Sequence, residues 1–196
     1  MKRLVVATRN AGKLKEIHFI LRDLHVEVSS LLDYPDLPPA VEDGETFEAN
    51  ASKKALHVAR ATGLPALADD SGLEVDALGG APGVHSARFA GPEATDEANN
   101  SKLLRLLKDV PEEKRSARFR CVIAVATPEG RVELAEGVCE GRAASKERGD
   151  KGFGYDPLFY VAEYGMTFFE VDGVCNVLCN IGSASSLSKS PITPFM

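Results

Sequence analysis

The amino-acid sequence predicts an α/β fold with a mixed β-sheet. Strand and helix patterns alternate along the first part of the chain in the order β-α-β-α-β. A β-hairpin pattern follows over residues 116–143. The chain has 196 residues, of which 44% are hydrophobic and 27% are charged, and it shows no internal repeat or linker, so we expect a single domain over residues 1–196.

The N-terminal region is expected to form a strand, a helix and a second strand. The apolar, β-branched run from Leu4 to Ala7 is typical of a buried strand. Apolar residues then recur at helical spacing over residues 11–24. These residues are Leu14, Ile17, Leu21 and Leu24. Val26 and Val28 indicate the second strand.

The next helix has recognisable ends. Thr46 is a suitable N-cap for a helix over about residues 47–61, and Gly63 ends it. Residues 64–78 are expected to form a short strand, an acidic turn and another strand. Residues 96–108 predict a further helix.

The hairpin and the C-terminal tail complete the chain. Pro128-Glu129-Gly130 marks the turn between the two hairpin strands. From Gly173 onward the sequence is enriched in Cys, Ser and Asn and contains no acidic residue. We therefore treat residues 171–196 as an atypical tail of the same domain.

Composition excludes several classes of function. A formal net charge of −6 argues against a broad nucleic-acid groove but leaves room for a compact anionic ligand. No stretch is apolar and long enough to span a bilayer, and no signal-peptide pattern is seen. The four cysteines form no C-x-x-C pair, so we expect no zinc site and interpret them as reduced thiols of a cytosolic protein.

A candidate phosphate-binding turn follows the first strand. Backbone N–H groups at a helix start favour anions, Lys13 adds a positive charge, and Asn10 adds a side-chain donor. A Walker A loop is excluded, because Ala7 stands where that loop needs Gly and Leu14 where it needs Ser or Thr. A solvated strand-to-helix turn with a surface lysine remains the alternative interpretation.

An acidic pair is the second candidate. Asp69 and Asp70, in the stretch ADDSG, repel each other unless a positive group compensates, and Mg²⁺ is a common compensator. The alternative is an ordinary acidic turn. On the preceding helix Asn50 and Lys54 share one face, which is either functional or simply the solvated face of an amphipathic helix.

An aromatic, glycine-rich stretch is the third candidate. In GDKGFGYDPLF, Phe153 or Tyr155 is suited to stack on a base, and Asp156 to accept from ring N–H groups. The alternative is a tight aromatic turn packed on the core. Upstream, Arg88 lies in the loop GAPGVHSARFAG and is suited either to a phosphate or to a structural acid.

Taken together, these stretches resemble the successive motifs of the inosine/xanthosine triphosphate pyrophosphatase family. The motifs are ATRNAGKLKEI, GETFEANASKKA, PALADDSGLEVDALGGAPGVHSARFAG and GFGYDPLF, and the resemblance covers residues 4–170. It implies a two-lobed fold around a long central mixed β-sheet flanked by helices, in a cytoplasmic homodimer. It also implies Mg²⁺-dependent hydrolysis of XTP, ITP and dITP to the monophosphate and pyrophosphate, which cleanses the nucleotide pool.

The resemblance also implies a role for each motif. The turn after the first strand would hold the triphosphate, and Lys54 would help to neutralise it. The residues of this turn are Thr8, Arg9, Asn10, Ala11, Gly12 and Lys13. Asp70 would bind Mg²⁺ and orient or deprotonate the attacking water, with Asp69 supporting it and Ser71 contacting the substrate.

The resemblance places the base and a second metal ligand as well. The base would lie in the aromatic stretch, with Phe153 stacking on it. The residues that would hold it are Phe153, Gly154, Tyr155 and Asp156. Glu42 lies where members of the family often carry a further metal-binding acid, and Val41 is the competing position.

The tail departs from the family pattern. Members usually end with a Lys-Asn pair and a Ser-His-Arg segment whose His-Arg pair reads the 6-oxo edge of the purine. Here no arginine follows Arg148 and no histidine follows His85. We hypothesise that the tail is read in a different frame from its relatives. Source DNA with no Ser-His-Arg coding nearby in any frame would refute this.

Two alternative functions remain open. One is a nucleotide-binding protein with impaired catalysis or relaxed base selectivity, because the base-reading segment is absent. The other is a related pyrophosphatase for modified pyrimidine nucleotides. A substrate profile separates these alternatives from hydrolysis of keto purines.

Overall fold

The computed structural model describes residues 2–23, 25–149, 153–162 and 165–167. The predicted tail over residues 171–196 lies outside the described residues. So does Leu24, the last residue of the expected first helix.

A seven-stranded mixed sheet forms the centre of the fold, with strand order β2-β1-β3-β4-β5-β6-β7. The strands are β1 Lys2–Val6, β2 Val26–Ser30, β3 Ala66–Val75, β4 Ser116–Ala126, β5 Val132–Ala143, β6 Phe159–Val161 and β7 Met166–Thr167. β1 is parallel to both of its neighbours, and every pair from β3 to β7 is antiparallel. The predicted α/β class with a mixed sheet is confirmed.

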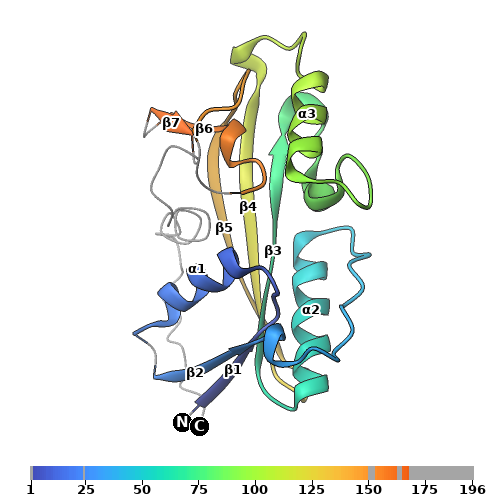
Figure 1. The fold of residues 1–196 in the computed structure, drawn as a ribbon, viewed down its shortest axis with the longest axis vertical. Coiled ribbons are helices and arrows are strands. Elements are labelled where there is room, and N and C mark those ends of the chain that lie inside the picture. Colours follow the sequence, from blue (N-terminus) through green and yellow to red (C-terminus); the bar gives the residue numbers. More distant parts are fainter. Residues whose placement is uncertain (1, 24, 150–152, 163–164, 168–196) are drawn as a thin grey trace.

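Helices flank the long strands. They are α1 Ala11–Leu21, α2 Phe47–Thr62 and α3 Asp96–Leu106. In Figure 1, α2 and α3 stand one above the other to the right of β3, β4 and β5, whereas α1 lies to their left. The caps follow the sequence: Thr46 caps α2, which ends at Gly63 in the left-handed conformation with φ of 67°.

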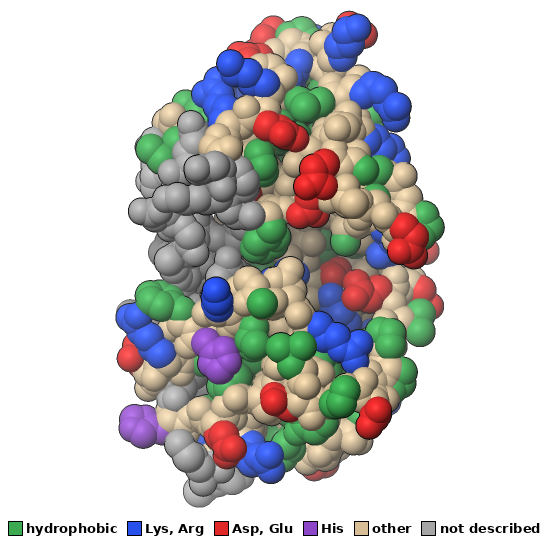
Figure 2. Space-filling model, in the orientation of Figure 1, with side chains coloured by type: hydrophobic (Ala, Val, Ile, Leu, Met, Phe, Trp, Pro, Cys, Tyr) green, Lys and Arg blue, Asp and Glu red, His purple; other side chains and the backbone are tan. Residues whose placement is uncertain are grey.

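Two hydrophobic clusters divide the molecule into two lobes that share the long strands. The upper cluster packs α3 against the end of β3, with Leu73 and Leu103 fully buried. The lower cluster packs α2 against the beginning of β3, with Phe47 and Ala68 almost fully buried. Figure 2 shows a hollow about half-way up this face, where acidic and basic side chains come together. The site described below lies between the lobes.

One prediction about β3 is wrong. Residues 64–78 were expected to contain an acidic turn between two strands, but β3 is a single strand from Ala66 to Val75. Each of its residues pairs with one of β4, from Ala126 to Ala117. This pairing comes from a distant part of the chain, and it overrides the local turn signal of Asp-Asp-Ser-Gly. The acidic pair is therefore held in the middle of a strand.

Candidate active site

A cavity of about 490 Å³ opens between the lobes, which is the size of a typical small-molecule pocket. The topology of the sheet explains its position. β1 pairs with β3 only through Val5↔Ala66 and Val6↔Leu67, after which the chain turns into α1. The edge of β3 beyond Leu67 is thus left without β1, and the cavity lies along this edge. Both faces of the strand contribute side chains to it.

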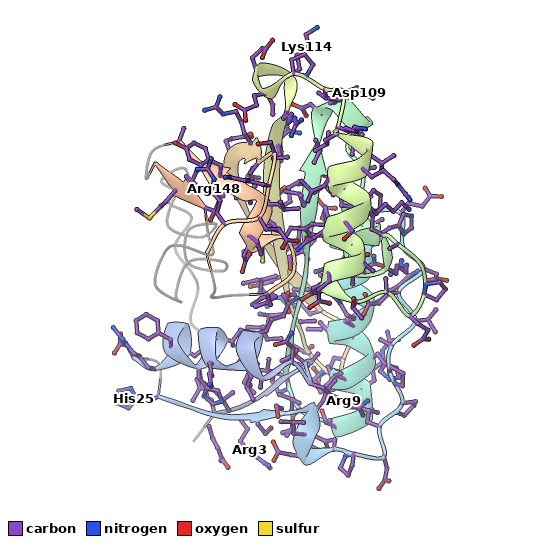
Figure 3. The ribbon with its side chains drawn as sticks, turned by 45° about the horizontal axis from the view of Figure 1, so that its top comes forward. Arg3, Arg9, His25, Asp109, Lys114 and Arg148 are labelled. Carbon is purple, nitrogen blue, oxygen red and sulfur yellow. The ribbon has the colours of Figure 1, made fainter. Side chains whose placement is uncertain are left out.

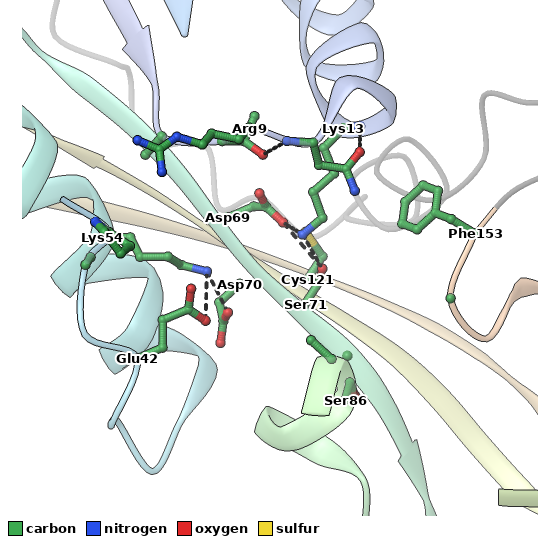
Figure 4. A pocket seen from close by; sticks show the side chains of 18 of the residues that line it. Arg9, Lys13, Glu42, Lys54, Asp69, Asp70, Ser71, Ser86, Cys121 and Phe153 are labelled. Carbon is green, nitrogen blue, oxygen red and sulfur yellow. Dashed lines mark hydrogen bonds and ion pairs between the residues drawn. The ribbon is translucent and has the colours of Figure 1, made fainter. Parts of the chain in front are cut away.

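The acidic pair is divided between the two faces of β3. Successive side chains of a strand point to opposite faces. Figure 4 shows Lys13 reaching Asp69 from one side of the strand, and Lys54 reaching Asp70 from the other. The two aspartates are only 6% and 8% exposed. Each buried carboxylate therefore has its own lysine, which offsets the cost of burying two neighbouring negative charges.

On one face, the N-terminus of α1 delivers Lys13. Asn10 caps the helix: its Oδ1 accepts from the backbone N–H of Gly12 at 2.8 Å and of Lys13 at 3.1 Å. Lys13 Nζ lies 2.5 Å from Asp69 Oδ2 and donates to Ser71 Oγ at 3.3 Å. The sequence predicts a donor role for Asn10, whereas in the structure its side-chain oxygen accepts these two bonds and fixes the start of the helix.

The Lys13–Asp69 pair is held in its charged form. Burial opposes the charge of Lys13, but the neighbouring Asp69 outweighs it and raises the lysine pKa above its ordinary value. Burial likewise opposes the charge of Asp69, but Lys13 and Lys54 outweigh it and lower the carboxyl pKa. Asp69 is therefore a stable anion that holds a lysine in the cavity.

On the other face, Asp70 is balanced differently. Its Oδ1 lies 2.7 Å from Lys54 Nζ, and its Oδ2 accepts from Asn50 Nδ2 at 3.2 Å. Burial raises the pKa of Asp70. The hydrogen bonds and charge from Lys54 and Asn50 offset this rise only in part, and the negative charge of Glu42 adds to it. A carboxylate with a raised pKa accepts a proton more readily than an ordinary aspartate. Asp70 is thus the stronger base of the pair.

Asn50 is a functional candidate to which the sequence interpretation gave no role. The side chain is fully buried. Its Oδ1 accepts from Gly44 N–H at 2.8 Å, which leaves its amide group facing Asp70. Asn50 therefore connects the loop before α2 to the acidic strand. Its spacing of four residues from Lys54 was the only signal in the sequence.

The loop before α2 brings Glu42, rather than Val41, to the site. Glu42 Oε2 lies 3.7 Å from Lys54 Nζ, whereas Val41 is 71% exposed. Arg88, whose partner the sequence left open between a phosphate and a structural acid, donates to the backbone oxygen of Glu42 at 3.1 Å. It therefore holds this loop.

The carboxylates of Glu42 and Asp70 are the kind of oxygen ligands that Mg²⁺ prefers. Within the described ranges, no group of three or more His, Cys, Asp or Glu residues is placed to hold a metal ion. A Mg²⁺ ion held by these two carboxylates would complete its coordination with phosphate oxygens and water, as is usual for this ion.

The aromatic stretch forms the upper wall of the cavity. Phe153 lies against Gly12, where a Cβ would stand 3.6 Å from a carbon of the ring. Asp156 is 3% exposed, and its Oδ2 accepts from the backbone N–H of Phe153 at 3.0 Å. Tyr155 donates its hydroxyl to the backbone oxygen of Ser86 at 2.9 Å, and burial raises its pKa. Two of these side chains thus hold the turn, and the Phe153 ring is left at the cavity (Figure 4).

Most of the predicted site residues line this cavity, from both lobes. They are Thr8, Arg9, Asn10, Lys13, Glu42, Lys54, Asp69, Asp70, Ser71, Phe153, Gly154, Tyr155 and Asp156. Ala11 and Gly12 lie in the first turn of α1 and are not among the lining residues. Cys121, on β4 opposite Ser71, also lines the cavity and was not predicted.

Arginine is scarce in the described part of the cavity. Arg9 lines it, but its guanidinium donates to the backbone oxygens of Leu37 at 2.9 Å and Pro35 at 3.4 Å. Arg148, the last arginine of the sequence, lies in the upper lobe away from Arg9 (Figure 3). Among the described residues, the lysines therefore supply the cations closest to the acidic pair.

Comparisons with known proteins agree with this architecture. The sequence model of the Ham1 family matches residues 4–174. A dITP/XTP pyrophosphatase from Desulforamulus reducens is 58% identical over 170 residues, which are 87% of this chain and 85% of the relative. A dITP/XTP pyrophosphatase from Geobacter sulfurreducens is 54% identical over 190 residues, 96% of each chain.

Solved structures show the same arrangement of the chain. A HAM1 protein from Coxiella burnetii superposes with a TM-score of 0.83 at 39% identity, covering 96% of this chain and 100% of that one. A nucleoside-triphosphatase / dITP/XTP pyrophosphatase from Mycobacterium abscessus gives a TM-score of 0.76 at 41% identity, covering 92% and 95%.

Proposed function

The chain belongs to the Ham1 family, and on that premise we propose that it hydrolyses the non-standard purine nucleotides XTP, ITP and dITP to the monophosphate and pyrophosphate. The enzyme is then a nucleoside-triphosphate pyrophosphatase that cleanses the nucleotide pool. The observation that carries this proposal is the pair of buried aspartates on opposite faces of β3, each held by its own lysine.

The two lysines supply the positive charge that a triphosphate needs. Lys13 and Lys54 lie on opposite sides of β3, so a polyphosphate in the cavity can be contacted from both sides. Both ammonium groups donate to carboxylates here, and phosphate oxygens can accept from their remaining N–H groups. Neutralising the phosphates is the main electrostatic requirement of phosphoryl chemistry.

Asp70 is proposed as the general base. It accepts a proton from the water that attacks the α-phosphorus, the bond from this phosphorus to the bridging oxygen breaks, and pyrophosphate leaves. Mg²⁺, held by Asp70 and Glu42, would supply charge stabilisation on the phosphate oxygens. Asp69 keeps Lys13 in position, and Ser71, which lies 3.4 Å from Asp69, contacts the substrate.

The base is proposed to bind in the upper lobe. Phe153 stacks on the purine, and the turn of Gly154, Tyr155 and Asp156 holds the phenylalanine ring in place. Hydrogen-bond donors that face O6 would favour keto purines, because a 6-amino group in place of the oxygen leaves those donors unpaired.

This proposal extends to a single-domain homodimer in the cytoplasm. No helix among the described residues has the length and apolar character needed to cross a membrane.

The direct test is pyrophosphate release from ITP, XTP, ATP, GTP and TTP, with Mg²⁺ and with EDTA. We expect metal-dependent release that favours ITP and XTP. Asp70→Asn should lower kcat by about 10²–10⁴, the usual contribution of a general base. Asp109→Asn, at the top of the upper lobe (Figure 3), serves as the control and should leave kcat unchanged.

A second candidate function is favoured by the composition of the tail. If the base-reading segment is absent, the protein binds nucleotides with impaired catalysis or relaxed selectivity. Binding of ITP without pyrophosphate release would support this alternative and contradict the first. Equal rates for ITP and ATP would support relaxed selectivity.

A further inference from the structure

We propose that Asp96 and Asn100, on α3, are positioning residues for the nucleotide base. This inference rests on the proposed function, in which Phe153 stacks on the purine. Neither residue belongs to the motifs that predicted the site. The two are four positions apart and therefore lie on one face of α3.

Both residues hold the peptide groups next to Phe153. Gly154 N–H donates to Asp96 Oδ2 at 2.7 Å, which fixes the peptide between Phe153 and Gly154. Asn100 Nδ2 donates to the backbone oxygen of Gly154 at 3.1 Å, which fixes the next peptide. Gly154 has a φ of 62°, a conformation that glycine adopts without strain. The helix thus fixes the turn on both sides of this glycine.

The helix is itself a firm support. Thr95 caps it, and Leu103 and Leu107 are fully buried in the upper cluster. Asn99 accepts from Ala90 N–H at 2.7 Å and donates to the backbone oxygen of Ala87 at 3.2 Å. A shift of α3 would therefore disturb the core. This anchored helix therefore holds the turn that carries Phe153, together with Asp156 and Tyr155.

Asn100 has a feature that a purely structural residue would not need. It is 4% exposed, and its Oδ1 is buried without a hydrogen-bond partner among the described residues. An unpaired buried acceptor costs stability. Leucine, whose side chain branches in the same way, carries no such acceptor. Asn100 therefore gives up stability while its amide group holds the turn.

The experiment isolates the contribution of the base. Ribose 5-phosphate has a hydroxyl group where inosine monophosphate has the base. The dissociation constant of ribose 5-phosphate divided by that of inosine monophosphate, both measured by calorimetry, therefore reports the contribution of the base to binding. Base–aromatic stacking is worth a factor of roughly 5 to 150 in affinity. In Asp96→Ala and in Asn100→Leu this ratio should fall about tenfold, while the affinity for ribose 5-phosphate stays within about twofold.

Conservative and control variants separate positioning from other roles. Asp96→Asn keeps an oxygen acceptor for Gly154 N–H and should restore the ratio. Glu97→Ala removes a neighbouring charge in the first turn of α3 and should not change the ratio. Asn100→Leu removes both the unpaired Oδ1 and the hydrogen bond to Gly154, so its unfolding temperature should change little, and the binding ratio rather than the stability separates positioning from a structural role.

Several results would overturn the proposal. These are an unchanged ratio in both Asp96→Ala and Asn100→Leu, an equal loss for both ligands, or a loss in Asp96→Asn as large as in Asp96→Ala. Equal affinity of the unaltered protein for the two ligands would also overturn it. Failure of the proposed function gives a different result, since the unaltered protein would then release no pyrophosphate from ITP, whatever the binding ratios are.

Discussion

Neutralising each of the two adjacent aspartates should change the stability of the metal-free protein in different ways. Asp69, 2.5 Å from Lys13 Nζ, has a lowered pKa because lysine charges outweigh its burial. Asp70 has a raised pKa because burial outweighs Lys54 and Asn50. Ionised Asp69 therefore stabilises the fold, and ionised Asp70 destabilises it.

The structure sets the size of the effect. Asp69→Asn leaves Lys13 with Ser71 Oγ at 3.3 Å as a neutral partner. A hydrogen bond between charged groups contributes about 1.5–3 kcal/mol, and the Lys13 side chain is 24% exposed, so we expect a loss of about 2 kcal/mol. For a domain of this size that is a fall in Tm of about 4–8 °C. Asp70→Asn keeps the side-chain volume and removes a desolvated charge, so Tm should stay unchanged or rise.

The effects also depend on pH in a defined direction. Because the pKa of Asp69 is lower in the folded than in the unfolded protein, its ionised form stabilises the fold. This contribution is fully present at a pH well above the ordinary pKa of 3.8 and is lost as the pH falls through the pKa of the folded state. The loss of unfolding free energy in Asp69→Asn, relative to the unaltered protein, should thus be largest at pH 7 and disappear in strongly acidic solution. The cost of ionised Asp70 is also full above its raised pKa and fades as the pH falls towards 3.8.

Thermal and urea unfolding in EDTA, followed by circular dichroism at neutral and acidic pH, measures these differences. Asp43→Asn is the matched control, because Asp43 pairs with Lys53 at 2.5 Å on the surface, where such pairs contribute little. The reasoning is refuted if Asp69→Asn is as stable as the unaltered protein, or if Asp70→Asn loses as much stability as Asp69→Asn.

Three further predictions follow from the site and the tail. Asn50→Ala removes the amide donor to Asp70 and should lower kcat about 10–100-fold with little change in KM. Pyrophosphate release at saturating Mg²⁺ measures both constants, and a change in KM alone would contradict the prediction. Gly72→Ala should lower the free energy of unfolding in urea by about 1–3 kcal/mol, because its Cβ would collide with Ser86 Oγ. The control Gly63→Ala, which lies in open space at a φ of 67°, should cost about 1–2 kcal/mol from backbone strain alone. Equal stability of Gly72→Ala and the unaltered protein would refute the collision. Because the tail lacks a His-Arg pair, the preference in kcat/KM for ITP over ATP should be smaller than about a hundredfold, and a stronger preference would show that base reading does not need that pair.

Local signals in the sequence determined the ends of helices and turns. Thr46 and Gly63 mark the ends of α2, because a capping oxygen and a left-handed glycine act on backbone groups within a few residues. The turn at Pro128-Glu129-Gly130 was predicted for the same reason, and it joins β4 to β5. The order of apolar runs was enough to predict the mixed sheet.

Only the tertiary structure decided how the acidic pair is used. The sequence alone favoured a turn at Asp69 and Asp70, whereas pairing with β4 makes this segment a strand and sends the two carboxylates to opposite faces. Lys13 is 56 positions away from Asp69, and Asp96 is 58 positions away from Gly154. No local pattern reports such contacts, because they depend on where the sheet and the core place distant parts of the chain. The sequence therefore determined which groups are available, and the fold determined which of them meet.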